Sequence, residues 1–507
     1  MKLTRLFISL LLLIFSCNIY AVKNKVISDK IDSIILNQLP AGTDVALMVY
    51  DLTNDTCIYA YRDAVLSRPA SVMKVITSTA ALSCLGADYN FETTIRTTGT
   101  IGTDSVLNGD VYIVGDIDPL FMEQDMKKMI ADMKAKGINR IDGTVYADIS
   151  VMDSVYWGSG WSWDDTPASF QPYISPLMVH GGYVGISVAP TRNGQPPKVS
   201  IYPQNNFIKV ENTAITGNSK LGPLTIRRDW LHNDNTIIVS GNSVRTQATD
   251  LSIVGSADFF FSLFKEYLAS AGICATSFGW AECPAGTDLL AKKSRPLTEV
   301  INEALKESNN LCAEAMFLHL GKLNTRKGVT FKDAIKYEEN FLKRIIGVNK
   351  ISYNIADGSG LSMYDYVSPS TIVGMLAHIY RDESLFNIMY KALPVSGVDG
   401  TLRGRMGSKN TFKKVHAKTG TLTGSCTLAG YAKGIDGRDF AFCIMNEGAI
   451  SMAPSRKVRL VVLNITFSPR VVGMLSLYMV TADLYSFPFV RKKTALMRPY
   501  QLRGFLP

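Results

Sequence analysis

Ser71 and Lys74 stand three residues apart in RPASVMKVITST, a stretch with the pattern of a helix N-terminus. Pro69 is typical of the first turn of a helix, and apolar residues follow it. Residues three apart are neighbours on one face of a helix, so Lys74 lies one turn beyond Ser71. A lysine that is desolvated and near another cation can lose its proton and become the base that a nucleophilic serine needs. The pair therefore predicts covalent catalysis by Ser71, with Lys74 as its base.

A helix start gives Ser71 a second role. The N–H groups of the first turn lack partners within the helix, so the N–H of Ser71 can donate to an oxyanion. The alternative is a structural helix whose Lys74 extends into water. A second Ser-x-x-Lys pattern, Ser262 to Lys265, lies inside a predicted helix over residues 257–272, where Lys265 can face solvent. We interpret that second copy as structural.

Lys418, Thr419, Gly420 and Thr421 form a short motif just before a predicted strand hairpin. Glycine at a strand edge lets an extended substrate approach closely, while the lysine and threonine side chains offer donors to a carboxylate. The motif thus indicates a site for a substrate that carries a carboxylate. The competing interpretation is an ordinary turn.

Ser308 and Asn310 form a third pattern, Ser-x-Asn, in VINEALKESNNLCAEAMFLHLG. The same pattern recurs at Ser240 and at Ser408, so the pattern alone is weak. Ser308, however, lies at the break between two apolar helical runs, where polar side chains can point into a cleft. The other two copies resemble turns.

The elements that must position these residues are of two kinds. Residues 44–61 predict a strand pair, the helix of Ser71 ends near Gly86, and residues 434–437 are the turn of a later hairpin. Between residues 91 and 284, short β runs are interrupted by an amphipathic helix over residues 122–136. Helices return over residues 297–320, 331–346 and 368–381. The pattern predicts one mixed α/β domain that is split by a mostly β insert.

The composition is that of a globular protein, with 47% hydrophobic and 19% charged residues among 507. This length exceeds one ordinary core, so two or three domains are expected. Residues 1–21 carry two units of the net charge of +9 and residues 466–507 carry five, which leaves +2 for the body. Charge therefore gives no support to nucleic-acid binding.

Metal and cofactor chemistry is not indicated. The five histidines form no ligand cluster, and the cysteines other than Cys17 are widely spaced with no C-x-x-C pair. We expect no metal and no cofactor. Cys274 and Cys283 could pair across a short loop, but small buried thiols are the interpretation that we favour for the cysteines.

Residues 1–21, MKLTRLFISLLLLIFSCNIYA, have a basic start, a short apolar run and a cleavage site after Ala21. They predict an export signal, because the run is short for a membrane span. Lipoprotein cleavage at Cys17 is the less favoured alternative, since Phe15 fits a lipoprotein box poorly. The apolar run over residues 471–490 leaves peripheral membrane contact open, although Asp483 would cost about 3 kcal/mol at a bilayer centre.

The three motifs in this order resemble the signature of penicillin-recognising serine enzymes, the penicillin-binding proteins and class A β-lactamases. Ser71 and Ser308 are 237 positions apart, more than a compact β-lactamase needs, and the insert fills this gap. The chain is therefore similar to the class C low-molecular-mass penicillin-binding proteins, the D-alanyl-D-alanine carboxypeptidase/endopeptidases of peptidase family S13. Further stretches that resemble this family are GWSWDD around Trp161, DGSGLS from Asp357 and VDGTLRGRM from Val398.

The resemblance implies a role for each motif residue. Ser71 would be acylated with Lys74 as its base, Ser308 would relay a proton to the leaving amine, and Asn310 would bind a substrate amide. Lys418 and Thr419 would hold the terminal carboxylate beside Gly420. The N–H groups of Ser71 and Thr421 would form the oxyanion hole. Asp165 is our candidate for binding the amine of a diaminopimelate side chain, and a purely structural role is its alternative.

The resemblance also implies a penicillin-binding-protein/β-lactamase-like transpeptidase domain of mixed α/β (α+β) class with two inserted domains. We expect the catalytic domain to comprise residues 22–92 and 288–465, and the insert to comprise residues 93–287. Within the insert, the first subdomain would comprise residues 93–165 and 245–287, and the second would comprise residues 166–244. Residues 466–507 form an unassigned tail.

The expected function is that of a periplasmic serine-type D-Ala-D-Ala carboxypeptidase/endopeptidase. Its partners would be peptidoglycan peptides that end in D-Ala-D-Ala or are cross-linked, with β-lactams as covalent inhibitors and no nucleic acid. A serine β-lactamase would use the same residues, and a catalytically idle peptidoglycan-binding protein is the alternative from another class. Retention of all three motifs argues against the idle protein.

Overall fold

The computed structural model describes residues 28–449 except 38, 40, 41, 348–351 and 435, together with residue 456. The predicted export signal, Cys17 and the 466–507 tail lie outside the described residues. Among the described helices, none combines the length and apolar character needed to cross a membrane.

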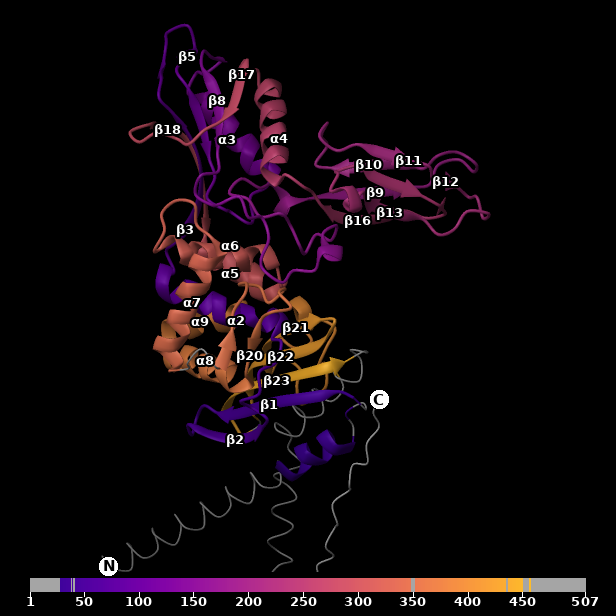
Figure 1. The fold of residues 1–507 in the computed structure, drawn as a ribbon, viewed down its shortest axis with the longest axis vertical. Helices are drawn as coiled ribbons and strands as arrows, with labels where there is room; N and C mark the ends of the chain where they lie inside the picture. Colours follow the sequence, from indigo (N-terminus) through magenta and orange to yellow (C-terminus); the bar gives the residue numbers. More distant parts are fainter. Residues whose placement is uncertain are drawn as a thin grey trace, which may run out of the picture. The chain divides into compact units, whose positions relative to one another are not determined.

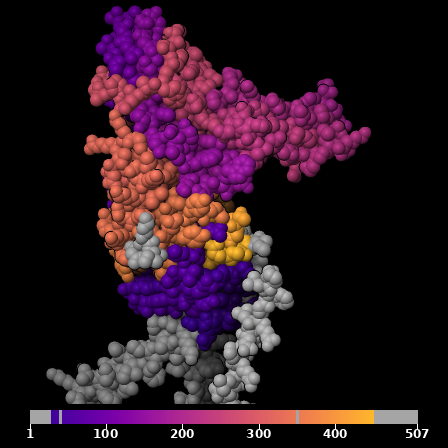
Figure 2. Space-filling view, viewed as in Figure 1, coloured from indigo at the N-terminus to yellow at the C-terminus, as the bar shows by residue number. Residues whose placement is uncertain are grey.

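A five-stranded antiparallel sheet with the order β2-β1-β23-β22-β21 joins segments from the two ends of the described chain. Its strands are β1 (Asp44–Asp51), β2 (Thr56–Tyr61), β21 (Val415–Leu422), β22 (Gly424–Lys433) and β23 (Asp439–Ala449). Because β1 pairs with β23, indigo and yellow residues adjoin in the space-filling view (Figure 2). Both predicted hairpins are confirmed, and β21 with its Lys-Thr-Gly motif is an edge strand.

Helices pack beside this sheet in the same part of the chain (Figure 1). They are α2 (Met73–Leu85), α5 (Leu297–Lys306), α6 (Asn310–Lys322), α7 (Phe331–Ile346), α8 (Pro369–Arg381) and α9 (Glu383–Ala392). The break between α5 and α6 falls at Ser308, as predicted. We did not predict α9, which begins directly after α8 because the Asp382 side chain accepts from the N–H groups of Ser384 and Leu385.

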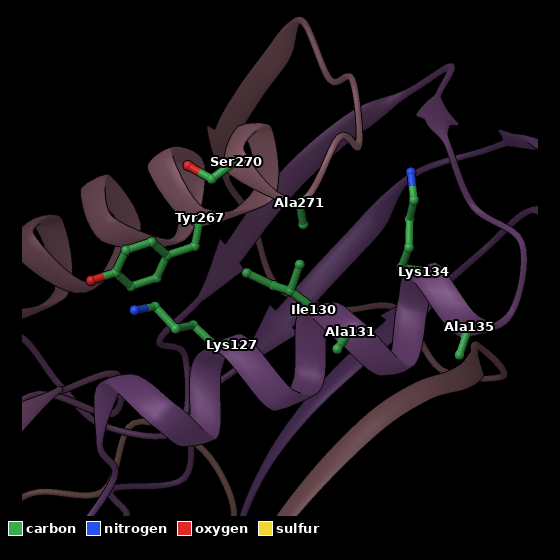
Figure 3. Close-up of a pocket in the computed structure, with 8 residues that line it drawn as sticks. All are labelled: Lys127, Ile130, Ala131, Lys134, Ala135, Tyr267, Ser270 and Ala271. Atoms are coloured by element: carbon green, nitrogen blue, oxygen red, sulfur yellow. The ribbon is translucent and has the colours of Figure 1, made fainter.

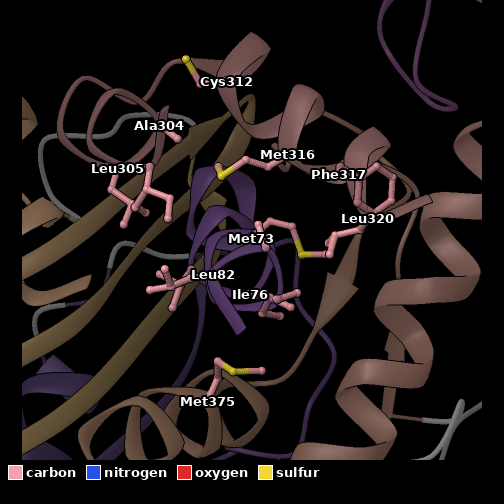
Figure 4. Close-up of a cluster of buried hydrophobic side chains, with 14 of the residues drawn as sticks. Met73, Ile76, Leu82, Ala304, Leu305, Cys312, Met316, Phe317, Leu320 and Met375 are labelled. Carbon is pink, nitrogen blue, oxygen red and sulfur yellow. The ribbon is translucent and has the colours of Figure 1, made fainter. Parts of the chain in front are cut away.

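Helix α2 lies in the middle of the hydrophobic core. All residues from Met73 to Leu82 are buried, so the helix has no solvent face on which Lys74 could extend into water. In Figure 4, Met73 and Ile76 lie near Phe317 and Leu320 of α6. The structural alternative for Lys74 is therefore wrong.

The insert contains a second five-stranded sheet, of order β17-β8-β6-β3-β18, and two helices (Figure 1). These elements are β3 (Asn90–Thr97), β6 (Val111–Val114), β8 (Thr144–Asp148), β17 (Ser277–Trp280), β18 (Asp288–Pro296), α3 (Glu123–Ala135) and α4 (Ser256–Ser270). The predicted boundaries at 92 and 288 fall at β3 and β18, which pair from Asn90 with Pro296 onward. This pairing favours an insert that begins near residue 90 and ends near residue 296.

A smaller group of strands follows within the insert. It comprises β9 (Tyr183–Ala189), β10 (Lys198–Tyr202), β16 (Gln247–Ser252), and the three-stranded sheet of β11 (Val210–Asn212), β13 (Thr225–Arg228) and β14 (Ile237–Ser240). We placed residues 247–252 with the first subdomain, but β16 pairs with β9. The second subdomain is therefore better extended to about residue 252.

Among the seven described cysteines, Cys274 and Cys283 both have free thiols, so the disulfide between them is not formed. Cys312, Cys426 and Cys443 are buried as we favoured, whereas Cys274 is exposed.

We predict that Leu320→Ala lowers the free energy of unfolding by about 2–5 kcal/mol, because it leaves a cavity in the core around α2. The measurement is urea unfolding followed by circular dichroism. Leu323→Ala is the matched control three residues along the chain, since its side chain is 47% exposed and its loss should stay within about 0.5 kcal/mol. Equal losses in both variants would contradict the packing described.

Candidate active site

Ser71 lies in a 3₁₀ turn, Ala70–Val72, directly before α2. The turn is held from β22, where Thr427 Oγ1 donates to the Pro69 carbonyl at 2.6 Å and Ser425 Oγ donates to the Arg68 carbonyl at 2.9 Å. Ala70 has a φ of +46°, a left-handed conformation that is uncommon for a residue with a side chain. Hydrogen bonds from β22 thus help to impose the conformation of the turn that carries Ser71, and such uncommon conformations are frequent at functional sites.

Two glycines let other backbone segments approach this turn. A Cβ on Gly420 of β21 would lie 2.7 Å from the Pro69 carbonyl and 3.0 Å from the Cβ of Ala70. A Cβ on Gly360 would collide with the Ala70 carbonyl, and Gly360 also has a φ of +76°. The glycine of the Lys-Thr-Gly motif therefore allows β21 to lie against Ser71, as well as leaving room for a substrate.

Lys74 is fully buried, and its amino group makes three hydrogen bonds. Nζ donates to Ser71 Oγ at 2.9 Å, to Asn310 Oδ1 at 2.6 Å and to the Ser359 carbonyl at 2.8 Å. Burial lowers the pKa of Lys74 from 10.5 to about 8, against the attraction of nearby carboxylates. A lysine held at the serine with this pKa is suited to accept a proton near neutral pH.

Lys418 forms a second buried pair with a serine. Its Nζ donates to Ser308 Oγ at 2.8 Å and to the Thr419 carbonyl at 2.9 Å. Burial, and then the charge of Lys74, hold the pKa of Lys418 well below its usual value. Ser308 has a φ of +64° between α5 and α6, a conformation that brings its hydroxyl to β21. The structure therefore brings the Ser-x-x-Lys, Ser-x-Asn and Lys-Thr-Gly motifs together.

The other predicted site residues differ in how directly they contact this centre. Thr419 Oγ1 donates to Thr401 Oγ1 at 2.9 Å, and Thr421 is exposed on the same strand. Asn310 Nδ2 donates to the Phe170 carbonyl at 2.9 Å, so Asn310 joins Lys74 to the insert. Asp165 lies five residues before Phe170, and among the described residues its carboxylate has no hydrogen bond or ion pair to a motif residue.

Several residues that support the site were not assigned roles from the sequence. They belong to the DGSGLS stretch and to α6: Glu314 accepts from the N–H of Ser359 at 2.8 Å, and Asp357 accepts from the N–H of Gly360 at 2.6 Å. The signal for Glu314 was its position four residues after Asn310, on the same face of a helix. The role of the Ser359 carbonyl has no side-chain signal at all.

The decoy motif lies elsewhere. Ser262 and Lys265 are on α4 of the insert, where the Lys265 ammonium lies 4.3 Å from the centre of the Phe261 ring and 5.0 Å from that of Phe278. Lys265 thus covers aromatic rings at the surface and has no contact with a serine nucleophile.

A pocket in the insert and a metal-binding group would be alternatives to this centre. A pocket of about 440 Å³ between α3 and α4 is lined by Lys127, Ile130 and Tyr267 among others, and by none of the motif residues (Figure 3). Within the described residues, no group of three or more His, Cys, Asp or Glu side chains is arranged to hold a metal.

A serine hydrogen-bonded to a buried lysine, opposite a second serine–lysine pair at a sheet edge, defines a serine acyl-transfer enzyme of the penicillin-binding class. Residues 27–465 match the model of the D-Ala-D-Ala carboxypeptidase 3 (S13) family, and the chain belongs to this family. It is a serine-type D-alanyl-D-alanine carboxypeptidase, and the resemblance drawn from the three motifs is confirmed.

Two curated relatives cover most of the chain. A D-alanyl-D-alanine carboxypeptidase of Actinomadura sp. (strain R39) is 30% identical over 84% of this chain and 82% of its own length. The D-alanyl-D-alanine carboxypeptidase DacB of Haemophilus influenzae is 27% identical over 80% of this chain and 86% of its own length. The crystal structure of penicillin binding protein 4 from Haemophilus influenzae matches with a TM-score of 0.77 and 24% identity, over 86% of this chain and 99% of that chain. This match confirms the fold class.

We predict that kcat/KM rises with pH, with a midpoint near the Lys74 pKa of about 8 and a plateau about one pH unit higher, because the neutral form of Lys74 becomes available over this range. The substrate should be an acyl-D-Ala-D-Ala methyl ester, so that charge pairing between Lys418 and a free carboxylate does not contribute. At pH 7 about one molecule in ten would hold Lys74 neutral. A rate that is constant from pH 6 to pH 9 would contradict the role of Lys74 as the base.

Proposed function

We propose that the enzyme acts through an acyl-enzyme on Ser71. Lys74 accepts the proton of the Ser71 hydroxyl as Oγ attacks the carbonyl carbon of the penultimate D-alanine. The peptide C–N bond then breaks, the terminal D-alanine or a cross-linked amine leaves with a proton, and water hydrolyses the ester. The observation that carries this proposal is the 2.9 Å contact between Ser71 Oγ and the fully buried Lys74 Nζ.

Ser308 and Lys418 are proposed to serve the leaving group. The 2.8 Å hydrogen bond between them supports a role for Ser308 as the relay that returns a proton to the departing amine. Asn310, which holds Lys74 with its oxygen, is proposed to bind a substrate amide. The N–H groups of Ser71 and Thr421 are proposed to stabilise the oxyanion.

The charge of Lys418 supports a substrate with a free carboxylate. Among the described residues, no carboxylate forms an ion pair with Lys418, and burial disfavours its ammonium. A substrate carboxylate held by Lys418 and Thr419 at Gly420 would supply the missing counter-charge. This complementarity favours peptides that end in D-alanine.

Peptidoglycan peptides are the proposed substrates, with β-lactams as covalent inhibitors. A β-lactam complex of the Haemophilus influenzae penicillin binding protein 4 gives support from the same fold. Asp165 is proposed to bind a diaminopimelate amine. Burial and the neighbouring charge of Asp164 raise the pKa of Asp165, so an ammonium beside it would stabilise its ionised form. The residue pattern of positions 1–21 supports export to the periplasm.

We predict that fluorescent penicillin labels the mature protein one to one, on the peptide that contains Ser71. The strained lactam amide stands in for the D-Ala-D-Ala bond, and its tethered leaving group hinders deacylation. Labelling is read by fluorescence on a gel and by mass of the labelled peptide. Ser71→Ala should abolish it and Lys74→Ala should slow it by about 100-fold or more, through loss of the base.

Ser262→Ala is the matched control, because its lysine partner covers aromatic rings on α4. This variant should label at the wild-type rate. A label that maps to Ser262, or that persists at full rate in Lys74→Ala, would assign the chemistry to the wrong helix.

We further predict that Lys418→Ala reduces kcat/KM more for peptides with a free C-terminal carboxylate than for their methyl esters. The difference should be about tenfold, the effect of one charge-assisted hydrogen bond. Equal losses of kcat/KM on both substrates would contradict the proposal that Lys418 binds the substrate carboxylate.

A further inference from the structure

The carbonyl of Ser359 holds Lys74, and two carboxylates fix the backbone around this carbonyl. Asp357 accepts from the N–H of Gly360 at 2.6 Å and from the N–H of Ser362 at 2.7 Å, while Glu314 accepts from the N–H of Ser359. Asp357 is fully buried. These hydrogen bonds thus fix the loop before and after the Ser359 carbonyl, which accepts from the Lys74 amine.

An arm of the insert, defined as residues 158–171, is seated on this loop. The indole N–H of Trp161 donates to Asp357 Oδ2 at 2.8 Å. Ser362 Oγ donates to the Ser159 carbonyl at 2.6 Å, and the N–H of Met363 donates to the Gly160 carbonyl at 3.0 Å. Among these contacts, the bond of Trp161 is the one that reaches a carboxylate of the Lys74 support.

We propose that Trp161 and Asp357 are positioning residues of the reaction, through which the insert sets the place of the base. The hydrogen bond from Trp161 fixes Asp357, Asp357 fixes the loop, and the Ser359 carbonyl of the loop fixes the Lys74 amine at Ser71. This inference rests on the proposed role of Lys74. It assigns to the insert a part in acylation itself, separate from binding the remainder of the substrate.

The hydrogen bonds from Trp161 through Asp357 to the loop should affect the pKa of Lys74, because this pKa depends on nearby charges and on the exclusion of water. Lys74 is faced from α6, from the loop and from β21 by these titratable groups: Cys312, Glu314, Asp357, Asp365 and Lys418. Exclusion of water is the main cause of its lowered pKa. A loosened loop would admit water and raise the pKa of Lys74, so less of the neutral base would be present near pH 7.

The test is the rate of Ser71 acylation by fluorescent penicillin in full-length Trp161→Phe, which keeps an aromatic ring and removes the N–H donor. We expect the rate at pH 7 to fall about tenfold, and the midpoint of its rise with pH to move upward by about half a unit or more. Trp163→Phe is the matched control, since Trp163 is 61% exposed. It should keep the wild-type rate and midpoint.

Ser362→Ala separates this bond from docking of the arm in general. It removes the Ser362 Oγ bond to the Ser159 carbonyl, together with the bond that Oγ accepts from the N–H of Tyr364, and leaves the Trp161 contact in place. We expect a smaller loss of acylation rate than in Trp161→Phe. The midpoint of the rise of this rate with pH should stay at its wild-type value. The double variant Asp357→Asn with Trp161→Phe should also be tested. Its acylation rate should fall by less than the product of the two single fold-losses, because both substitutions break the same contact.

A wild-type rate and midpoint in Trp161→Phe, with Ser71 still labelled in the wild type, would overturn this inference alone. Equal shifts in Ser362→Ala and Trp161→Phe would overturn it as well, because any arm contact would then suffice. If the wild type itself is not labelled at Ser71, the proposed function fails instead.

Discussion

Burial of the Lys74 amine is the constraint on which the site depends. An amine removed from water must find hydrogen-bond partners, and the partners of Lys74 come from three distant parts of the chain: Ser71, Asn310 and Ser359. The fold must therefore bring α2, α6 and the loop after residue 356 to one point. The order of the elements serves this need, since α2 is buried at the centre of the helices and presents its first turn to the sheet.

The sheet edge supplies the opposite wall of the site. β21 is an edge strand of the sheet, and its first residues bond to residues 394–396 on the outer side. The Lys-Thr-Gly part of this edge is therefore the part at which an extended substrate could add. Gly420 lets this strand lie close to the Ser71 turn, and Thr427 of β22 fixes the Pro69 carbonyl of the same turn. The turn that carries Ser71 and the edge that carries the Lys-Thr-Gly motif are thus held by one pair of strands.

The sequence was most informative about the side chains of the candidate site and about the helix start that exposes the Ser71 N–H, and least informative about backbone carbonyl groups in loops. Ser71, Lys74, Ser308 and Lys418 could be named because the three motifs occur together in one order and at a helix start, a helix break and a hairpin. The hairpins and most helices followed from periodicity and turn residues. The Ser359 carbonyl left no signal in residue type.

Tertiary pairing explains the remaining differences from the sequence prediction. β3 and β18 pair over about 200 positions of the chain, which local patterns do not show, and this pairing favours ends of the insert a few residues away from the expected ones. Helix α9 was missed because a single N-cap residue separates it from α8.

Charge balance behind Lys74 completes the account of the site. Four buried carboxyl groups gather there, Glu314, Glu338, Asp357 and Asp365, and ionised carboxylates would favour the ammonium form of Lys74. Burial raises the pKa of Glu314 to about 8 and holds those of Glu338 and Asp365 well above their usual values. Burial thus disfavours the ionised form of Glu314, Glu338 and Asp365, so these three groups attract the ammonium less than their number suggests. The same exclusion of water that disfavours ionisation of these three groups also lowers the pKa of Lys74, which supports its proposed role as the base.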